Sequence, residues 1–168
     1  MKPLVVDLPY PTLDGIEKNQ KIAREIACAY TGFHSEMTAI LQYVYHAFFF
    51  NKLGQNDTAD LLESIAIAEM QHLDVLGKLL IKLGEDPIFA IKSPCGYDFY
   101  STASVTYSKT PQKMLLDDIS GELLAIKQYE KIISNVFDEQ VASIITRIKL
   151  DEELHVLALK KQLDKICS

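Results

Sequence analysis

Residues 36–43 read EMTAILQY, and residues 122–129 read ELLAIKQY, so five of the eight positions are identical. Each copy begins with a glutamate and ends with Gln-Tyr, and each holds apolar residues at helical spacing. Two similar segments this far apart indicate two related halves of one chain. A solenoid is excluded, because solenoid proteins repeat at much shorter periods. We therefore expect two similar structural units, each containing one copy.

A glutamate followed three residues later by a histidine occurs once in each half. Glu69 and His72 belong to the first half, and Glu152 and His155 belong to the second. Residues three apart lie about one turn apart on the same face of a helix. Both pairs stand among apolar residues at helical spacing, so this face is predicted to be buried.

Apolar residues spaced by three and four predict four long helices. The expected ranges are about 15–53, 57–83, 111–137 and 139–166. The apolar stripe of the first helix consists of Ile22, Ile26, Tyr30, Phe33, Met37, Ile40, Val44 and Phe48. Asn56 or Asp57 is expected to cap the second helix. Gly84 suits the end of that helix, and Pro111 suits the first turn of the third.

The lengths of the connections predict the topology. Short links join the first helix to the second and the third to the fourth, which makes each pair antiparallel neighbours. The connection over about residues 85–110 is far longer than usual and can cross the length of the bundle. Residues 1–14 contain three prolines and are expected to form an extended arm. Residues 15–168 are thus predicted to be an all-α four-helix bundle of two antiparallel hairpins joined by a long crossover.

The composition is that of an ordinary globular protein, with 48% hydrophobic and 24% charged residues and a formal net charge of −6. The negative charge argues against a nucleic-acid partner, because nucleic acids select basic surfaces. No stretch is apolar for long enough to span a membrane, and residues 1–7 lack the apolar core of a signal peptide. The three cysteines form no CxxC pair. We expect a cytoplasmic protein with neither a nucleic-acid nor a membrane partner.

Six residues of the two halves share the property that each lies on an apolar helix face. They are Glu36, Glu69, His72, Glu122, Glu152 and His155. Burying an unpaired charge costs at least several kcal/mol, and the arginines Arg24 and Arg147 lie a turn or more away. Two divalent cations would neutralise four carboxylates, and ligands rich in oxygen with some imidazole suit iron or manganese. These six residues are therefore predicted to bind two metal ions.

Two tyrosines lie close to the predicted ligands. Tyr43 and Tyr129 follow Glu36 and Glu122 by seven residues, which is about two turns on the same face. They are interpreted either as core tyrosines with satisfied hydroxyls or as functional groups. In the second case each would donate a hydrogen bond to a ligand glutamate or act as a redox-active phenol.

Other polar residues give weaker signals. His34 and His46 have no partner at ligand spacing and are expected at the surface or the rim of the site. Four further acidic residues are expected to be solvated, namely Glu63, Asp74, Asp151 and Glu153. Asp74 or Asp151 could instead accept a hydrogen bond from a ligand histidine.

The pattern of one glutamate in each of two helices and Glu-x-x-His in each of the other two resembles the ferritin-like superfamily of di-metal carboxylate proteins. The resemblance covers about residues 20–166 and is nearest to the rubrerythrin and bacterioferritin branches. It assigns the ligand roles to the six residues named above, and it places the tyrosine found in many ferritins at Tyr43. Met70 stands where bacterioferritins have a haem-ligating methionine, although an outward, interface-facing methionine is the preferred interpretation.

Three departures from these branches limit what the resemblance implies. Ile119 and Ala125 stand where rubrerythrins carry a further glutamate ligand. Paired CxxC motifs are absent, so a separate protein is expected to donate electrons where they are needed. Only 13 residues follow His155, which predicts a small oligomer, a homodimer, in place of a 24-subunit shell.

The resemblance implies a di-iron oxidoreductase that acts on hydrogen peroxide or dioxygen. A rubrerythrin-like peroxidase and a ferroxidase are the two versions of this hypothesis. Manganese catalases share the fold and a similar ligand spacing, so a manganese catalase is the alternative enzyme. A bundle in which metals only stabilise the fold is the non-enzymatic alternative.

Overall fold

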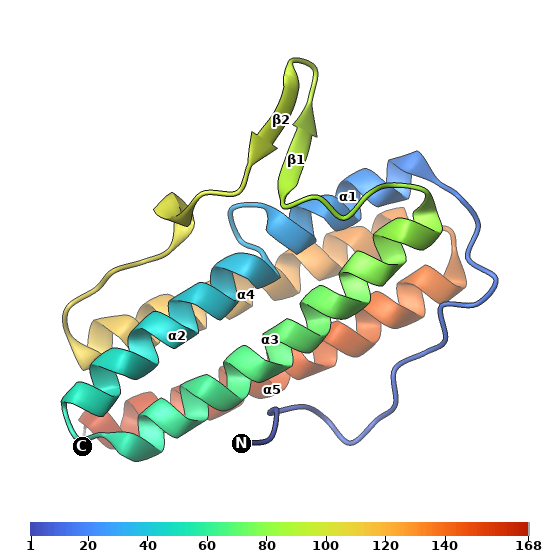
Figure 1. Cartoon of the computed structure of the whole chain (residues 1–168). Helices are drawn as coiled ribbons and strands as arrows, with labels where there is room; N and C mark the ends of the chain where they lie inside the picture. Colours follow the sequence, from blue (N-terminus) through green and yellow to red (C-terminus); the bar gives the residue numbers. More distant parts are fainter. Residues whose placement is uncertain (168) are drawn as a thin grey trace.

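The computed structural model describes residues 1–167 and forms an elongated helical bundle (Figure 1). Its elements are α1 (Gln20–Thr31), α2 (Glu36–Lys52), α3 (Asn56–Leu83), β1 (Ala90–Ser93), β2 (Gly96–Phe99), the 3-10 helix η1 (Thr102–Ser104), α4 (Pro111–Asn135) and α5 (Glu139–Cys167). None of the helices in this part of the chain has the length and apolar character needed to span a bilayer.

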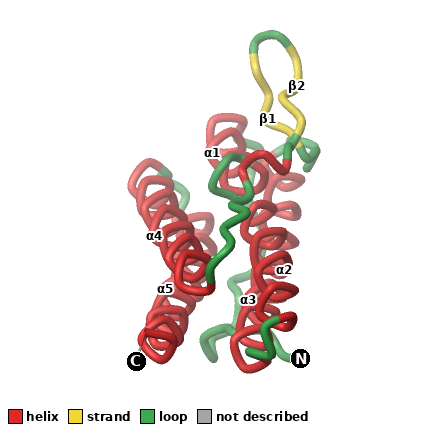
Figure 2. The backbone as a smooth tube through the Cα atoms, turned by 90° about the vertical axis from the view of Figure 1, so that its left-hand side faces the viewer, coloured by secondary structure: helices red, strands yellow, loops and turns green. Residues whose placement is uncertain are grey.

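Two antiparallel hairpins make up the bundle, as predicted. Helix α2 packs along α3, and α4 packs along α5, with the two pairs side by side in Figure 2. Residues 53–55 and 136–138 form the short links within the hairpins. Residues 84–110 cross from one end of the bundle to the other, so α3 and α4 begin at the same end and run parallel (Figure 1). The predicted all-α fold with a long crossover is confirmed.

The first predicted helix is broken in two, which corrects the expectation of one helix over residues 15–53. Asn19 caps α1 by accepting hydrogen bonds from two backbone amides, both at 3.1 Å, so α1 begins later than expected. Helix α1 ends at Gly32, where a Cβ atom would lie 2.4 Å from the Cys28 carbonyl oxygen. Ser35 then caps α2 through its hydroxyl. A glycine that permits close approach, followed by a strong N-cap residue, explains the break.

The break also shifts which residues from Phe33 onward face the core. Phe33 and Phe48 were expected on the buried stripe, but they are 64% and 66% exposed. A new stripe begins at the first residue of α2 and runs at helical spacing through Ile40, Ala47 and Phe50, all buried. A stripe cannot keep its phase across a non-helical segment, because the 3.6-residue period holds only within a continuous helix.

The other helix ends differ little from the prediction. Gly84 ends α3 in the left-handed conformation with φ 90°, as expected. Neither Asn56 nor Asp57 caps this helix, because α3 already begins at Asn56 and the residue before it, Gln55, makes no side-chain cap bond. Pro111 occupies the first turn of α4, as expected.

The crossover contains a β-hairpin that the sequence pattern did not predict. Strands β1 and β2 pair antiparallel, with Ala90 opposite Phe99 and Ser93 opposite Gly96. The hairpin projects from the bundle near α1 (Figure 1). At its base the Phe89 ring stacks on Tyr30 of α1 at a centroid distance of 5.5 Å, which fixes where the crossover leaves the bundle.

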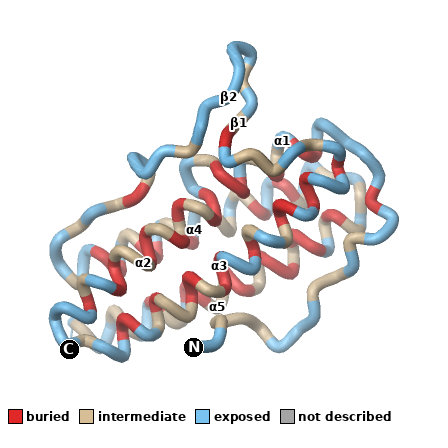
Figure 3. Tube along the Cα trace, in the orientation of Figure 1, coloured by how far each residue is buried: buried red, intermediate tan, exposed pale blue. Residues whose placement is uncertain are grey.

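Two apolar clusters form the core, one towards each end of the bundle. The first surrounds Ile26, Leu79 and Ile144, and the second surrounds Phe50 and Met114. Figure 3 shows the buried residues on the inward faces of the helices. The predicted metal ligands belong to neither cluster, so a polar layer interrupts the hydrophobic core.

Candidate metal centre

The four long helices bring the six predicted ligands together in the centre of the bundle. Each of the six side chains is at most 3% exposed. They come from all four helices: Glu36 from α2, Glu69 and His72 from α3, Glu122 from α4, and Glu152 and His155 from α5. The apolar stripes that bury each helix therefore also bury its ligands.

These residues form two groups, each with four atoms that a metal ion could bind. Glu36 and His72 belong to the first group, and Glu122 and His155 belong to the second. Glu69 and Glu152 belong to both. Within each group the ligand atoms lie within 4.8 Å of one another. Two adjacent sites that share two carboxylates form the arrangement in which bridging glutamates hold a pair of metal ions.

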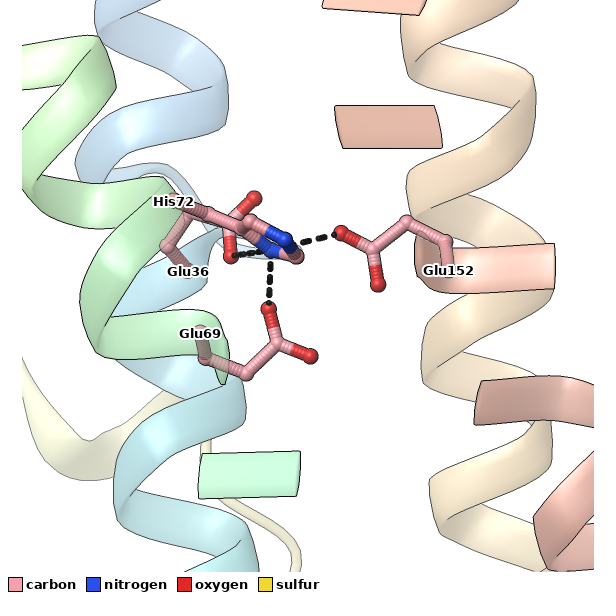
Figure 4. A group of neighbouring side chains, drawn as sticks. All are labelled: Glu36, Glu69, His72 and Glu152. Carbon is pink, nitrogen blue, oxygen red and sulfur yellow. Dashed lines mark hydrogen bonds and ion pairs between the residues drawn. The ribbon is translucent and has the colours of Figure 1, made fainter. Parts of the chain in front are cut away.

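Both histidine rings turn the same nitrogen towards the carboxylates. The Nδ1 atom of His72 lies 2.9 Å from a Glu69 oxygen and 3.1 Å from a Glu152 oxygen (Figure 4). The Nδ1 atom of His155 lies 3.1 Å from Glu69 and 3.1 Å from Glu152. The two rings are 6.0 Å apart between centroids. Each ring can thus offer one nitrogen to its own site.

The metal-free cluster is electrostatically strained. Burial, followed by repulsion from neighbouring glutamates, raises the pKa of Glu36 and of Glu122 well above the usual value of 4.5. Burial opposes ionisation of Glu69 as well, but hydrogen bonding from Glu36 and the nearby histidine charges hold its pKa well below that value. Burial alone would lower the pKa values of His72 and His155, yet the surrounding carboxylates raise both well above 6.5. Cations at this position would remove the repulsion.

Several carboxylate oxygens in the cluster lack a hydrogen-bond donor. One oxygen each of Glu36, Glu69 and Glu152 is buried without a hydrogen-bond partner among the described residues, although a histidine Nδ1 atom lies within 3.4 Å of each. Buried polar atoms are nearly always satisfied in folded proteins, and exceptions need an explanation such as an ion. Four carboxylates and two imidazoles suit iron or manganese. The residues present therefore fit a pair of such metal ions.

The two tyrosines cross between the hairpins. The Tyr43 hydroxyl of α2 donates to Glu122 of α4, and the Tyr129 hydroxyl of α4 donates to Glu36 of α2. Both tyrosines are buried. Burial, followed by the negative charge of the partner glutamate, raises the pKa of each phenol well above 10. Each phenol therefore stays protonated. Each donates to a glutamate that belongs to a single ligand group, Tyr129 to Glu36 and Tyr43 to Glu122.

A family comparison agrees with this arrangement. The model of the ferritin-like domain family matches residues 32–167, which is most of the chain. The chain belongs to the ferritin-like family. No curated protein sequence matches it.

Among solved structures, this ferritin-like chain is similar to KatB, a manganese catalase from Anabaena. Two crystal structures of KatB each match with a TM-score of 0.83 and 23% sequence identity. One match covers 95% of this chain and 78% of KatB, and the other covers 96% and 80%. The similarity shows that the two proteins share a fold.

Asp151 is buried, which corrects the expectation that it is a solvated charge. Its Oδ2 lies 3.1 Å from Nε2 of His72, which matches the alternative of a hydrogen-bond acceptor for a predicted ligand histidine. Arg147 forms an ion pair with it at 2.7 Å. Burial opposes ionisation of Asp151, but the hydrogen bonds from His72, from the Val6 amide and from Arg147 hold its pKa below 3.8. The position of Asp151 beside Glu152 in the sequence was the only signal for this role.

His46 is fully buried, which corrects the expectation of a surface or rim position. Its Nδ1 lies 2.8 Å from Oδ1 of Asp118, and the Gln42 amide donates to the same oxygen at 2.8 Å. Burial raises the pKa of Asp118, and these hydrogen bonds oppose the rise. The partners lie on α2 and α4, so sequence spacing could not reveal this pair.

The remaining polar candidates lie outside the centre. His34 is exposed, as expected. Asp74 is exposed and pairs with Lys78 at 2.5 Å, so it does not contact a ligand histidine. Met70 is 47% exposed on α3, which agrees with the preferred interpretation of an outward-facing side chain.

A cavity of about 260 Å³ extends from the centre to the surface between α2 and α4. Its inner wall includes Glu36, Glu122 and both buried tyrosines. Its outer wall includes the exposed Phe33 and residues 103–106 of the crossover. A small molecule can therefore reach the carboxylates from this side of the bundle.

Proposed function

We propose that this ferritin-like chain is a di-metal oxidoreductase that acts on hydrogen peroxide or dioxygen. The observation that carries the proposal is the pair of buried ligand groups that share Glu69 and Glu152. A pair of redox-active ions bound by these residues would supply the two electrons that cleave an O–O bond within one site. Reduction of hydrogen peroxide to water needs two electrons and two protons, which matches a dinuclear centre.

The residues of the chain have distinct roles in this proposal. Glu69 and Glu152, which belong to both groups, would be shared by the two ions, and Glu36 and Glu122 would each hold one ion. The tyrosine hydroxyls would orient these last two carboxylates, since each carboxylate accepts one hydrogen bond from a tyrosine of the other hairpin. The cavity between α2 and α4 admits the substrate, and the apolar clusters at both ends keep bulk water away.

The identity of the metal separates the two enzyme candidates. With iron, the centre would be a peroxidase that takes electrons from a separate donor protein, as the rubrerythrin resemblance implies, or a ferroxidase whose electrons come from the ferrous iron that it oxidises. With manganese, the centre would be a catalase that converts two molecules of peroxide to dioxygen and two of water without an external donor. The likeness in fold to a manganese catalase favours this second candidate.

Reaction of each metal form with hydrogen peroxide tests the function. Peroxidase activity predicts that peroxide oxidises the ferrous protein without evolving oxygen and that a chemical reductant restores it. Catalase activity predicts steady oxygen evolution from the manganese form. If both reactions are absent in protein that contains two equivalents of metal, and dioxygen also leaves the absorption spectrum of the ferrous protein unchanged, the proposal is overturned and the metals only stabilise the bundle.

Metal content of a double variant tests the ligand assignment. Glu69→Ala combined with Glu152→Ala removes both shared carboxylates, so metal content measured by elemental analysis should fall from two equivalents to near zero. Glu153→Ala is the matched control, because Glu153 pairs with Lys149 at 2.6 Å and faces away from the centre. Two equivalents bound at unchanged affinity in the double variant would show that the assignment is wrong.

A further inference from the structure

The N-terminal arm (residues 1–14) lies along the α3–α5 side of the bundle (Figure 1). Its Leu4 amide donates to the Ser64 carbonyl of α3 at 3.1 Å. From α5, Arg147 donates to the carbonyls of Leu8 and Val6 at 2.8 and 3.0 Å. The arm is thus attached to both helices that carry a Glu-x-x-His motif. The substrate cavity opens elsewhere, between α2 and α4.

The arm contacts His155 directly. Nε2 of His155 lies 2.8 Å from the Leu4 carbonyl oxygen. A carbonyl oxygen can only accept a hydrogen bond, so this nitrogen carries a proton and donates. The lone pair of the neutral ring is then on Nδ1, the atom that faces Glu69 and Glu152. The arm therefore fixes both the tautomer and the orientation of this ring.

The arm contacts His72 through one intermediate. Nε2 of His72 donates to Asp151, and two groups of the arm hold that carboxylate in place. The Val6 amide donates to it at 2.7 Å, and the Tyr10 hydroxyl donates at 3.0 Å. The Tyr10 ring also packs beneath the Arg147 guanidinium at 4.5 Å, and Arg147 pairs with the same carboxylate.

We propose that the arm is a positioning element of the metal centre, in which the Leu4 carbonyl, the Val6 amide and the Tyr10 hydroxyl fix the outer nitrogens of both ligand histidines. This inference rests on the proposed metal-binding function. Groups that hydrogen-bond to a ligating histidine keep its ring aligned, and their loss commonly lowers metal affinity about 10- to 100-fold. Loosening of the arm should therefore weaken metal binding although none of its residues is a ligand.

Zinc binding to the full-length protein tests the inference without any measurement of catalysis. Zinc is diamagnetic, so the ring nitrogens of both histidines can be observed by ¹⁵N NMR in the loaded protein. Tyr10→Phe removes only the hydroxyl, and we expect about 10-fold weaker zinc binding in competition with a chelator. The Nε2–H proton of His72 should shift and exchange faster with water. That of His155 should stay unchanged in this variant, because the Leu4 carbonyl holds it.

Two further variants make the test specific. Val6→Pro removes the amide donor to Asp151 and should weaken zinc binding at least as much as Tyr10→Phe. Tyr97→Phe is the control, because Tyr97 lies exposed on β2, and it should bind zinc like the unmodified protein. If Val6→Pro does not fold, the zinc affinity and His72 signals of Tyr10→Phe alone test the positioning role of the arm.

The outcomes separate this inference from the proposed function. Equal zinc affinity and unchanged His72 signals in the folded Tyr10→Phe and Val6→Pro variants would overturn the positioning role alone. Failure of the unmodified protein to bind zinc through either histidine would overturn the proposed metal centre and this inference together.

Discussion

At the residue scale, the two tyrosines that we propose to orient the metal centre lie on the opposite hairpin from the carboxylates they contact. Tyr43 reaches Glu122, and Tyr129 reaches Glu36. These glutamates belong to one metal group each, so each tyrosine restrains a carboxylate that a single ion would bind. The two contacts are equivalent because the two tyrosines occupy the same position in the two copies of the sequence repeat.

Removal of either hydroxyl should therefore have nearly the same effect. Tyr43→Phe and Tyr129→Phe each leave a ligand glutamate without its donor, and we expect peroxide consumption per bound metal to fall about 10-fold. Metal content should stay near two equivalents, because no ligand is lost. Tyr45→Phe is the control, since its hydroxyl accepts a hydrogen bond from Lys109 at 2.9 Å near the surface. Unchanged rates in both variants would contradict an orienting role.

The buried pair of His46 and Asp118 also acts at the residue scale, through stability. His46→Leu leaves the Asp118 carboxylate buried without its imidazole partner. Breaking a buried pair in this way costs about 3–5 kcal/mol, so we expect the free energy of unfolding in urea to fall by about 3 kcal/mol. His34→Leu should change it little, because His34 is exposed. Equal stability of the two variants would show that the pair does not stabilise the fold.

At the element scale, the break between α1 and α2 places a predicted metal ligand at a helix start. Glu36 is the first residue of α2, where the partial positive charge of the helix N-terminus favours a carboxylate. A continuous helix would have put the same residue in a helix interior. The break depends on Gly32, because a side chain there would collide with the Cys28 carbonyl.

Gly32→Ala should therefore disturb both the break and the metal centre. The Cβ atom would lie 2.4 Å from the Cys28 oxygen, so the backbone must shift, at a cost of about 1–3 kcal/mol in unfolding free energy. The affinity for metal should fall as Glu36 moves. Gly121→Ala is the matched control, since nothing lies within 4 Å of its Cβ position, and this change should stabilise α4 by up to about 1 kcal/mol. If Gly32→Ala melts at the same temperature as the unmodified protein, the expected strain is contradicted.

At the scale of the whole molecule, two similar hairpins face each other across four buried carboxylates. Without metal, folding stability depends on the protons that these groups hold. The folded-state pKa values of Glu36 and Glu122 are raised above 4.5, and those of His72 and His155 are raised above 6.5. A raised pKa means that the folded state binds the proton more tightly than the unfolded state does.

The stability of the metal-free protein should consequently fall as pH rises. The two histidines contribute their full share to the free energy of unfolding below about pH 6.5. This stabilisation is lost as pH rises through their folded-state pKa values. Glu69 has a lowered pKa, so its contribution is already complete above about pH 4.5 and does not offset the loss. The metal-loaded protein should show the opposite trend, because protons displace metal in acid. Thermal melts with and without a chelator from about pH 5 to about pH 8 would measure both trends, and identical profiles would contradict a shared buried metal site.

The homodimer stays a prediction at this scale. Phe33 and Leu124 are exposed beside the mouth of the same cavity, and apolar surface of this kind is often buried between subunits. Light scattering should report the mass of two chains. A mass near that of 24 chains would contradict the expectation of a small oligomer.

The sequence by itself determined the bundle, its two-hairpin topology and the six residues that meet at the centre. These features are local: helical spacing fixes which face of a helix is apolar, and Glu69 and His72 share a face because they are three residues apart. The tertiary structure alone decided the burial of His46 and the attachment of the arm to His155. Each of these depends on a partner on another element, and the Leu4 carbonyl that meets His155 is a backbone group. Every residue has a backbone carbonyl, so the role of the Leu4 carbonyl cannot be predicted from the sequence.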